Sequence, residues 1–131
     1  MPNPFQIDMN MQTDIPDEDP VAQEVHIRSQ IRQVRELTDK PIGINIRNRS
    51  SSIAEAWIKV VIEEKVPVAY TSVSSPSALT ERLHEIGMKV IHIGTTVRHA
   101  VKAEEAGVDA FAIAGVEAGG HSPGHGETTL F

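Results

Sequence analysis

The chain has 131 residues, no cysteine and a formal net charge of -6 at pH 7, enough for one ordinary domain without disulfides or thiolate chemistry. The acidic balance and the lack of a basic patch argue against nucleic-acid binding. No apolar run reaches the ~20 residues of a membrane span and no signal-peptide layout opens the chain, so we expect a cytoplasmic protein without nucleic-acid or membrane partners.

The first part of the chain, residues 1–24, shows no sustained hydrophobic period. It carries four prolines and an acidic cluster, namely Pro2, Pro4, Pro16, Pro20, Asp14, Asp17, Glu18 and Asp19. Such a composition is typical of extended or disordered chain. We therefore expect an irregular lead over residues 1–24 and a folded domain over residues 25–131.

From Val25 onward, helical and strand patterns alternate. In chain order, the pattern predicts a helix over 25–37, a strand over 41–46, a helix over 51–64, a strand over 66–71, a helix over 75–86, a strand over 88–92, a helix over 96–106 and a strand over 109–114. Predicted helix caps are Ser75 before Pro76, Thr96, and the left-handed terminators Gly87 and Gly107.

Four strand–helix units at this short spacing indicate parallel strands in an α/β fold, either a (β/α)8 barrel or an open doubly wound sheet. A dinucleotide-binding open sheet should show a Gly-x-Gly-x-x-Gly turn after its first strand. Here Arg-Asn-Arg-Ser-Ser-Ser follows Ile46, so the pattern favours the barrel. A full TIM barrel takes ~250 residues. We therefore expect a partial TIM (β/α)8 barrel of about four βα units, truncated at both ends.

The run Gly115–His121 follows the last predicted strand. Glycines at a strand end let a ligand approach the backbone closely, and a histidine after them adds a titratable ring. Ligands of α/β proteins bind at the carboxyl ends of strands. The run therefore predicts part of a cofactor and catalytic site, with a glycine-rich turn and a surface histidine as the alternative.

Three segments resemble one family. Arg35–Asn45, Lys89–Ala110 and Glu117–His121 are similar to the third, fifth and sixth strand regions of nitronate monooxygenases, formerly called 2-nitropropane dioxygenases. The Glu-Ala-Gly-Gly-His pattern also resembles that of flavin-dependent enoyl-acyl carrier protein reductases of the same superfamily. The resemblance covers residues from about Arg28 to Phe131 and assigns them to the third to sixth strands of the barrel.

The resemblance implies a TIM barrel that holds FMN at the carboxyl ends of its strands. Asn45, Gly119 and Gly120 match the residues that contact the flavin, and His121 matches the active-site histidine. The implied activity is flavin-dependent oxidation of alkyl nitronates or nitroalkanes by molecular oxygen, giving carbonyl compounds. At Ile93, some members of the family carry a Lys or Gln that contacts FMN.

Two alternatives remain beside this oxidoreductase. One is an NAD(P)H-dependent enoyl-thioester reductase of the same superfamily. The other is a catalytically silent, truncated product that self-associates, because a half barrel leaves two unpaired sheet edges.

The remaining polar residues are interpreted individually. His92 is expected in the core, and His84 and His99 on solvated helix faces. A metal held by His121 and His125 is not expected, because no carboxylate or Cys partner accompanies them. Side chains that follow the strands and are able to bind a polar or anionic ligand are Arg47, Arg49, Ser72, Ser74 and Ser75.

Overall fold

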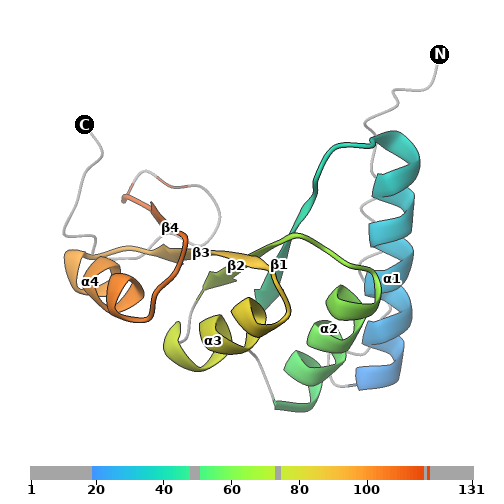
Figure 1. The fold of residues 1–131 in the computed structure, drawn as a ribbon, viewed down its shortest axis with the longest axis horizontal. Coiled ribbons are helices and arrows are strands. Elements are labelled where there is room, and N and C mark those ends of the chain that lie inside the picture. The colour runs from blue at the N-terminus through green and yellow to red at the C-terminus, as the bar shows by residue number, and fades with distance from the viewer. Residues whose placement is uncertain (1–18, 48–50, 73–74, 117, 119–131) are drawn as a thin grey trace.

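The computed structural model describes residues 19–47, 51–72, 75–116 and 118 (Figure 1). Its elements are α1 (Pro20–Leu37), β1 (Gly43–Arg47), α2 (Ser51–Glu63), β2 (Val68–Ser72), α3 (Ser77–Glu85), β3 (Lys89–Gly94), α4 (Val97–Glu105) and β4 (Ala110–Ile113). None of the described helices is both long and apolar enough to span a lipid bilayer.

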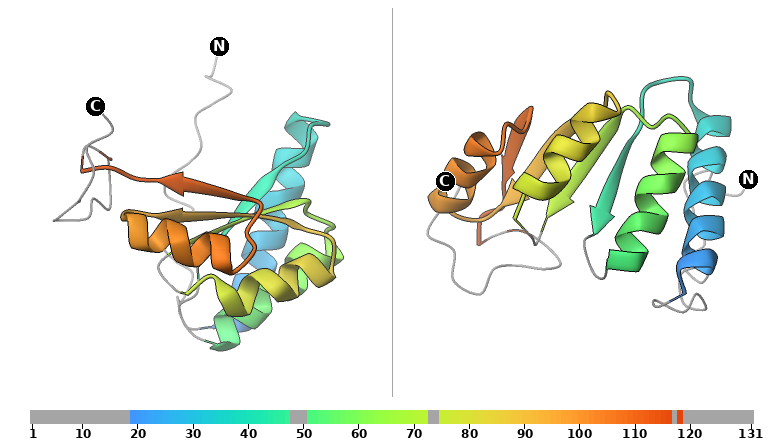
Figure 2. Two further views of the ribbon diagram at one scale, coloured as in Figure 1. Left: turned by 60° about the vertical axis from the view of Figure 1, so that its left-hand side comes forward. Right: turned by 60° about the horizontal axis from the view of Figure 1, so that its bottom comes forward.

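The four strands form one parallel sheet in the order β1-β2-β3-β4. An open doubly wound sheet reverses its strand order at a switch point, whereas a barrel adds its strands in sequence. The described helices cover one face of this sheet and leave the other uncovered (Figure 2). The partial TIM barrel of about four βα units, predicted from the sequence, is therefore confirmed.

The hydrophobic core lies between the sheet and its helices. Ile46, Ala69 and Val90 contribute fully buried side chains from three adjacent strands. Helix residues of the same cluster are Ile27, Ile31, Val60, Val61 and Leu83. Alternate residues of a strand point to opposite faces of the sheet. The residues on either side of Ile46, Ala69 and Val90 in the sequence therefore point to the uncovered face.

Helix α1 begins at Pro20, inside the stretch expected to be an irregular lead. The Asp19 side chain accepts hydrogen bonds from the backbone N–H of Val21 (2.9 Å) and Ala22 (3.3 Å). Proline is pre-organised for the first helical position, so Asp-Pro is a helix start. The expectation for residues 20–24 was therefore wrong, and residues 1–18 lie outside the described part of the chain.

The other predicted helix ends agree with the structure in three of four cases. The Thr96 hydroxyl accepts a hydrogen bond from the N–H of His99 (3.2 Å), and Gly87 and Gly107 adopt φ values of +79° and +76°. Ser75 does not cap α3. Pro76 occupies the cap position in a helical conformation, with φ -69° and ψ -22° and no side-chain cap bond, because its ring already fixes φ near the helical value.

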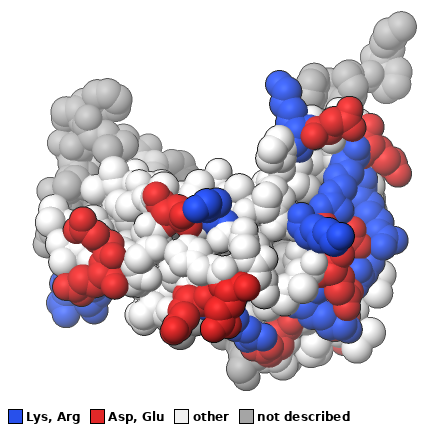
Figure 3. All heavy atoms as spheres, viewed as in Figure 1, with Lys and Arg blue, Asp and Glu red and all other residues white. Residues whose placement is uncertain are grey.

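A group of charged side chains joins α1 to α2. Glu64, whose side chain is 9% exposed, accepts from Arg28 (3.0 Å), Arg32 (2.9 Å) and Arg35 (3.0 Å). Burial raises the pKa of Glu64, but the hydrogen bonds from Arg32 and Arg28 outweigh it, and the pKa is lowered overall. Figure 3 shows Lys and Arg side chains gathered over α1. These contacts hold α1 beside α2.

Candidate functional site

The uncovered face of the sheet carries a row of side chains at one level. Asn45 pairs in register with Tyr70, Tyr70 with Ile91, and Ile91 with Ala110. The residues next to them in the sequence, Ile46 among them, point toward the helices. This row therefore lies on the face that forms the inside of a closed barrel.

Asn45 is exposed and is the third of the five residues of β1. Within the described part of the chain, no hydrogen-bond partner is found for its carboxamide. A side-chain amide offers two donors and an acceptor. The Asn45 amide is therefore free to hydrogen-bond a group on the uncovered face.

Tyr70 is a neighbour of Asn45 that sequence reasoning missed. It is half-buried, and its ring lies so close to β1 that a Cβ added at Gly43 would meet Tyr70 Cε2 at 2.6 Å. Gly43 therefore leaves room for the aromatic ring on the uncovered face. The pairing is visible only once the register of β1 and β2 is known, and no local signal in the sequence indicates it.

Gly119, Gly120 and His121 lie outside the described residues, so their place in the site stays a prediction. The chain that leads to them is described as far as Val116. The N–H of Ala114 donates to the Gly94 carbonyl (2.9 Å), which extends the pairing of β4 with β3. Because the strands are parallel, β4 ends at the same edge of the sheet as β1. The chain therefore leaves the sheet toward the predicted motif at the carboxyl edge, where β1 ends two residues after Asn45.

Other predicted polar residues are distributed unevenly around this edge. Ser72 is half-buried on the uncovered face and pairs in register with Arg47 and Ile93. The hydroxyl of Ser75 contacts that of Ser77 at 3.1 Å. Arg49 and Ser74 lie outside the described residues, as does His125. Ile93, half-buried beside Ser72, offers an aliphatic surface and no donor.

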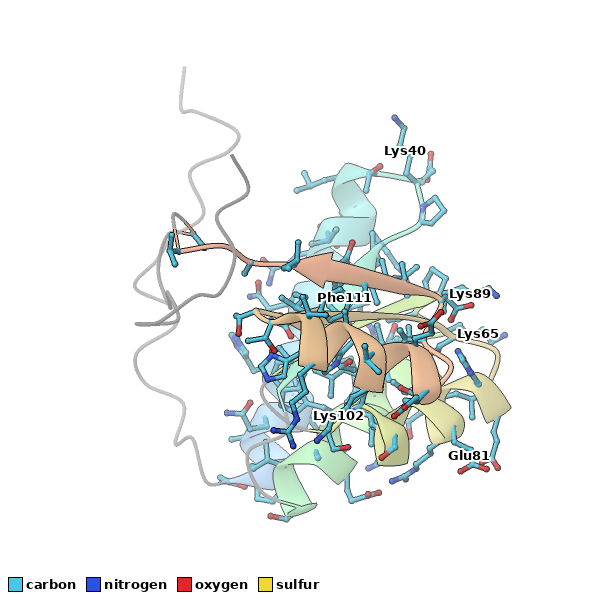
Figure 4. All side chains as sticks on the ribbon, turned by 90° about the vertical axis from the view of Figure 1, so that its left-hand side faces the viewer. Lys40, Lys65, Glu81, Lys89, Lys102 and Phe111 are labelled. Atoms are coloured by element: carbon cyan, nitrogen blue, oxygen red, sulfur yellow. The ribbon has the colours of Figure 1, made fainter. Side chains whose placement is uncertain are left out.

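His92 lies on the helix-facing side of β3, away from the candidate site. It is 4% exposed, and 2.8 Å separates its Nδ1 from Thr71 Oγ1. Its ring centroid is 6.3 Å from that of Phe111, a residue seen between the strands and α4 in Figure 4. Burial lowers the pKa of His92, and the charge of His99 adds to this effect. The interpretation of His92 as a core histidine is confirmed.

Asp109 organises the opposite, amino-terminal edge of the sheet. Its carboxylate accepts from Lys89 Nζ (2.8 Å), from the N–H of Val90 (2.8 Å) and from His84 Nε2 (2.7 Å). The hydrogen bond from Lys89 contributes most to holding the pKa of Asp109 far below its usual range, followed by those from Val90 and His84. Figure 4 shows Lys89 at this edge. His84 is thus exposed, as expected, but hydrogen-bonded to Asp109.

Metal-ligating side chains do not gather in the part of the chain that the structure describes. No group of three or more His, Asp or Glu residues is found there with a geometry suited to a metal ion. His99, the remaining helical histidine, is exposed, and its Nδ1 accepts from the backbone N–H of Thr95 (3.2 Å). The described site therefore consists of an amide, an aromatic ring and aliphatic side chains.

A parallel sheet in sequential order with helices on one face defines a protein of the α/β-barrel class. A sequence model of the family described as nitronate monooxygenase matches residues 23–131. The chain belongs to the nitronate monooxygenase family, as the resemblance implied.

Three relatives show how broad this family likeness is. A dehydrogenase from Rhodococcus jostii, (3aS,4S,5R,7aS)-5-hydroxy-7a-methyl-1-oxo-octahydro-1H-indene-4-carboxyl-CoA dehydrogenase, is 38% identical over 79% of this chain and 29% of its own length. A nitronate monooxygenase from Paraburkholderia phytofirmans is 26% identical over 72% of this chain and 36% of its own length. FabK from Thermotoga maritima superimposes with a TM-score of 0.69 at 37% identity over 82% of this chain and 33% of that chain. The chain thus spans about a third of the length of these relatives.

Proposed function

We propose that this chain forms part of the FMN site of an oxidoreductase that converts alkyl nitronates to carbonyl compounds with molecular oxygen in the cytoplasm. The observation that carries the proposal is the position of Asn45. It is exposed on the uncovered face, in the middle of β1, and has no partner among the described residues. Membership of the nitronate monooxygenase family supports the same assignment.

The described residues fit a flavin. The row beside Asn45 consists of Tyr70, Ile91 and Ala110, an uncharged surface on which a flat aromatic ring system packs. The Asn45 amide is able to hydrogen-bond the polar edge of such a ring. In the proposal, Gly119 and Gly120 let the cofactor lie close to the backbone.

When bound, FMN supplies the redox chemistry of the reaction. The chain contributes orientation and proton transfer. Asn45 fixes the ring edge, and His121 removes the α-proton of a neutral nitroalkane, since an imidazole with a pKa near neutrality accepts a proton at working pH. A nitronate has already lost that proton and needs His121 only for positioning.

Flavin binding tests the proposal on the chain itself. The family resemblance implies that the residues gripping the FMN phosphate belong to later strands, so we expect weak binding, with riboflavin and FMN of similar affinity. Asn45→Ala should weaken both, whereas Gln33→Ala, which removes an exposed amide on α1, should weaken neither. Flavin fluorescence titration measures the affinities. A chain that leaves flavin fluorescence unchanged, or an N45A variant of unchanged affinity, would refute the assignment.

A second candidate function is an NAD(P)H-dependent reductase or dehydrogenase of thioester substrates. The 38% identity to a dehydrogenase of a carboxyl-CoA compound favours it, as does the 39% identity to a point variant of FabK, which superimposes with a TM-score of 0.70. The two functions differ in what they consume. Oxygen uptake with a nitronate supports the first, and NAD(P)H oxidation with an enoyl thioester supports the second.

A catalytically silent, self-associating product is the third candidate. It predicts that neither assay gives turnover, even when flavin is bound. The surfaces through which the chain would self-associate are a separate question, because association and activity do not exclude each other.

A further inference from the structure

Two histidines lie at the junction between β3 and α4. His92 of β3 is 4% exposed, and 2.8 Å separates its Nδ1 from Oγ1 of the buried Thr71. Its Nε2 has no partner among the described residues. On α4, the exposed His99 accepts a hydrogen bond at Nδ1 from the backbone N–H of Thr95 (3.2 Å). Both rings therefore contribute to the junction through Nδ1.

The chain is packed closely at this junction. A Cβ added at Gly94, the last residue of β3, would meet the Cβ of His99 at 2.7 Å and Cζ of Phe111 at 2.8 Å. The Phe111 ring also lies beside His92, with 6.3 Å between the two ring centroids. Phe111 of β4, labelled in Figure 4, therefore lies near both histidines. We call His92, Gly94, His99 and Phe111 the junction cluster.

Protonation opposes both histidine contacts. A protonated imidazole carries a hydrogen on each nitrogen, so a protonated His99 cannot accept the N–H of Thr95 at Nδ1. A protonated His92 places a charge in a buried position, which is unfavourable unless the charge is paired. Burial lowers the pKa of His92, and the charge of His99 lowers it further. The packed junction cluster therefore requires both rings to be neutral.

The surroundings of His92 offer no compensating charge among the described residues. Thr71 of β2 and Phe111 of β4 are uncharged, and Asp109 lies at the opposite edge of the sheet. The other charged and titratable residues of α3, β3 and α4 are exposed, namely Glu81, Arg82, His84, Glu85, Lys89, Arg98, Lys102, Glu104 and Glu105. Of the described groups, His99 is the one whose charge acts on the pKa of His92.

We propose that His92 and His99 make the junction between β3 and α4 a pH-sensitive switch. At neutral pH both rings are uncharged, and the start of α4 stays packed on β3 and β4. In acid the two protonated rings repel each other and His99 releases Thr95, so the start of α4 separates from the sheet. The connection that moves, residues 94–96, lies at the carboxyl edge, where barrel proteins bind ligands. This inference does not depend on the proposed function.

The direction of the pH dependence follows from the buried histidine. Because the pKa of His92 is lowered in the packed junction, chiefly by burial, the opened junction binds a proton more readily. The packed state is therefore fully stable above the ordinary histidine pKa of ~6.5 and loses stability as the pH falls below it. One such group raises the equilibrium constant for opening by up to ~10-fold per pH unit. The acid sensitivity expected from a carboxylate begins only near pH ~4.

Amide hydrogen exchange at about pH 7 and about pH 5.5, corrected for the intrinsic pH dependence of exchange, tests the switch. The Ala100 amide, which donates to the Thr96 carbonyl (3.2 Å), reports on the start of α4. Its equilibrium constant for opening should rise ~5–10-fold at the lower pH. The Glu64 amide, which donates to the Val60 carbonyl (2.8 Å) after α2, is the internal reference and should change less than ~2-fold.

Glutamine variants identify the groups responsible. A variant carrying His92→Gln and His99→Gln should lose the pH dependence, because the amide keeps a donor and an acceptor and does not titrate. The control His26→Gln, on α1, should keep it. If the double variant does not fold, NMR of the imidazole nitrogens in the unchanged chain should show His92 titrating below ~6.5. An Ala100 amide indifferent to pH, a folded double variant that keeps the response, or a His92 ring that titrates at or above ~6.5 overturns the proposal.

Discussion

The two edges of the sheet differ in how far their polar groups are satisfied. At the amino-terminal edge, the Asp109 carboxylate accepts three hydrogen bonds, from His84, Lys89 and the Val90 backbone. Toward the carboxyl-terminal edge, two residues before the end of β1, the Asn45 amide has no partner among the described residues. Barrel proteins use the first edge for stability and the second for ligands. The difference indicates that a substitution at one edge should change folding and at the other should change binding.

The largest effect is expected at His121, which the proposal places at the carboxyl edge. The assay uses a form of the protein that oxidises nitronates. In it, His121→Asn should slow the reaction of neutral nitroalkanes by ~10²–10⁴-fold, the usual contribution of general-base catalysis. Preformed nitronates should lose much less, because their α-proton is already gone. Oxygen uptake with both substrates measures this. An equal loss on both would show that His121 acts in binding and not as the base.

A smaller effect, on stability, is expected at the amino-terminal edge. Asp109→Asn removes the charge that Lys89 and His84 contact, and hydrogen bonds to charged groups contribute about 1.5–3 kcal/mol. The Asp109 side chain is 26% exposed, so we expect a loss of about 1–2 kcal/mol in the free energy of unfolding. Urea denaturation measures it. Lys89→Met, at a side chain that is 72% exposed, is the matched control and should cost less.

The Asp109 carboxylate should also make the free energy of unfolding depend on pH. The pKa of Asp109 is lowered in the folded chain, chiefly by the hydrogen bond from Lys89. A lowered folded pKa gives stability that is present above the unfolded pKa of ~3.9 and is lost as pH falls below it. The unfolding free energy of the unchanged chain should therefore drop more steeply below about pH 4 than that of Asp109→Asn. Parallel pH profiles for the two chains would contradict this origin of the acid sensitivity.

The smallest stability effect is expected at Asn45. Because its amide has no partner to lose among the described residues, Asn45→Ala should change the free energy of unfolding by less than about 0.5 kcal/mol. Flavin affinity should fall by about 2–10-fold, the equivalent of one hydrogen bond. Denaturation and fluorescence titration of one preparation separate the two effects. A marked loss of stability with unchanged flavin affinity would contradict the prediction, because Asn45 would then act in folding and not in binding.

Local patterns predicted most of the secondary structure. Gly87 and Gly107 end their helices in left-handed conformations, and Thr96 caps α4, because each of these features depends on a few adjacent residues. The early start of α1 was missed, although Asp19 and Pro20 are a local helix signal, because the surrounding prolines and acidic residues were interpreted as one irregular segment. The error concerned where one segment ended and the next began.

The site was predictable only in part. Asn45 was predicted from a family motif, and its role in a site stays a prediction; the structure shows it exposed in the middle of β1. Its neighbour Tyr70 was not found, because the contact depends on the register between β1 and β2. The face on which His92 lies also depends on tertiary contacts. A histidine in a strand can point to either face of the sheet, and packing against Thr71 and the helices decides which.

The sequence by itself determined the alternation of strands and helices, their caps and the family, since hydrophobic periodicity and short motifs act over a few residues. The tertiary structure alone decided that Asp109 meets His84 and Lys89, residues about 20 to 25 positions earlier in the chain. It also decided which face of the sheet the described helices leave uncovered. Both depend on strand register and helix packing, which join residues distant in sequence and leave no mark on their local pattern.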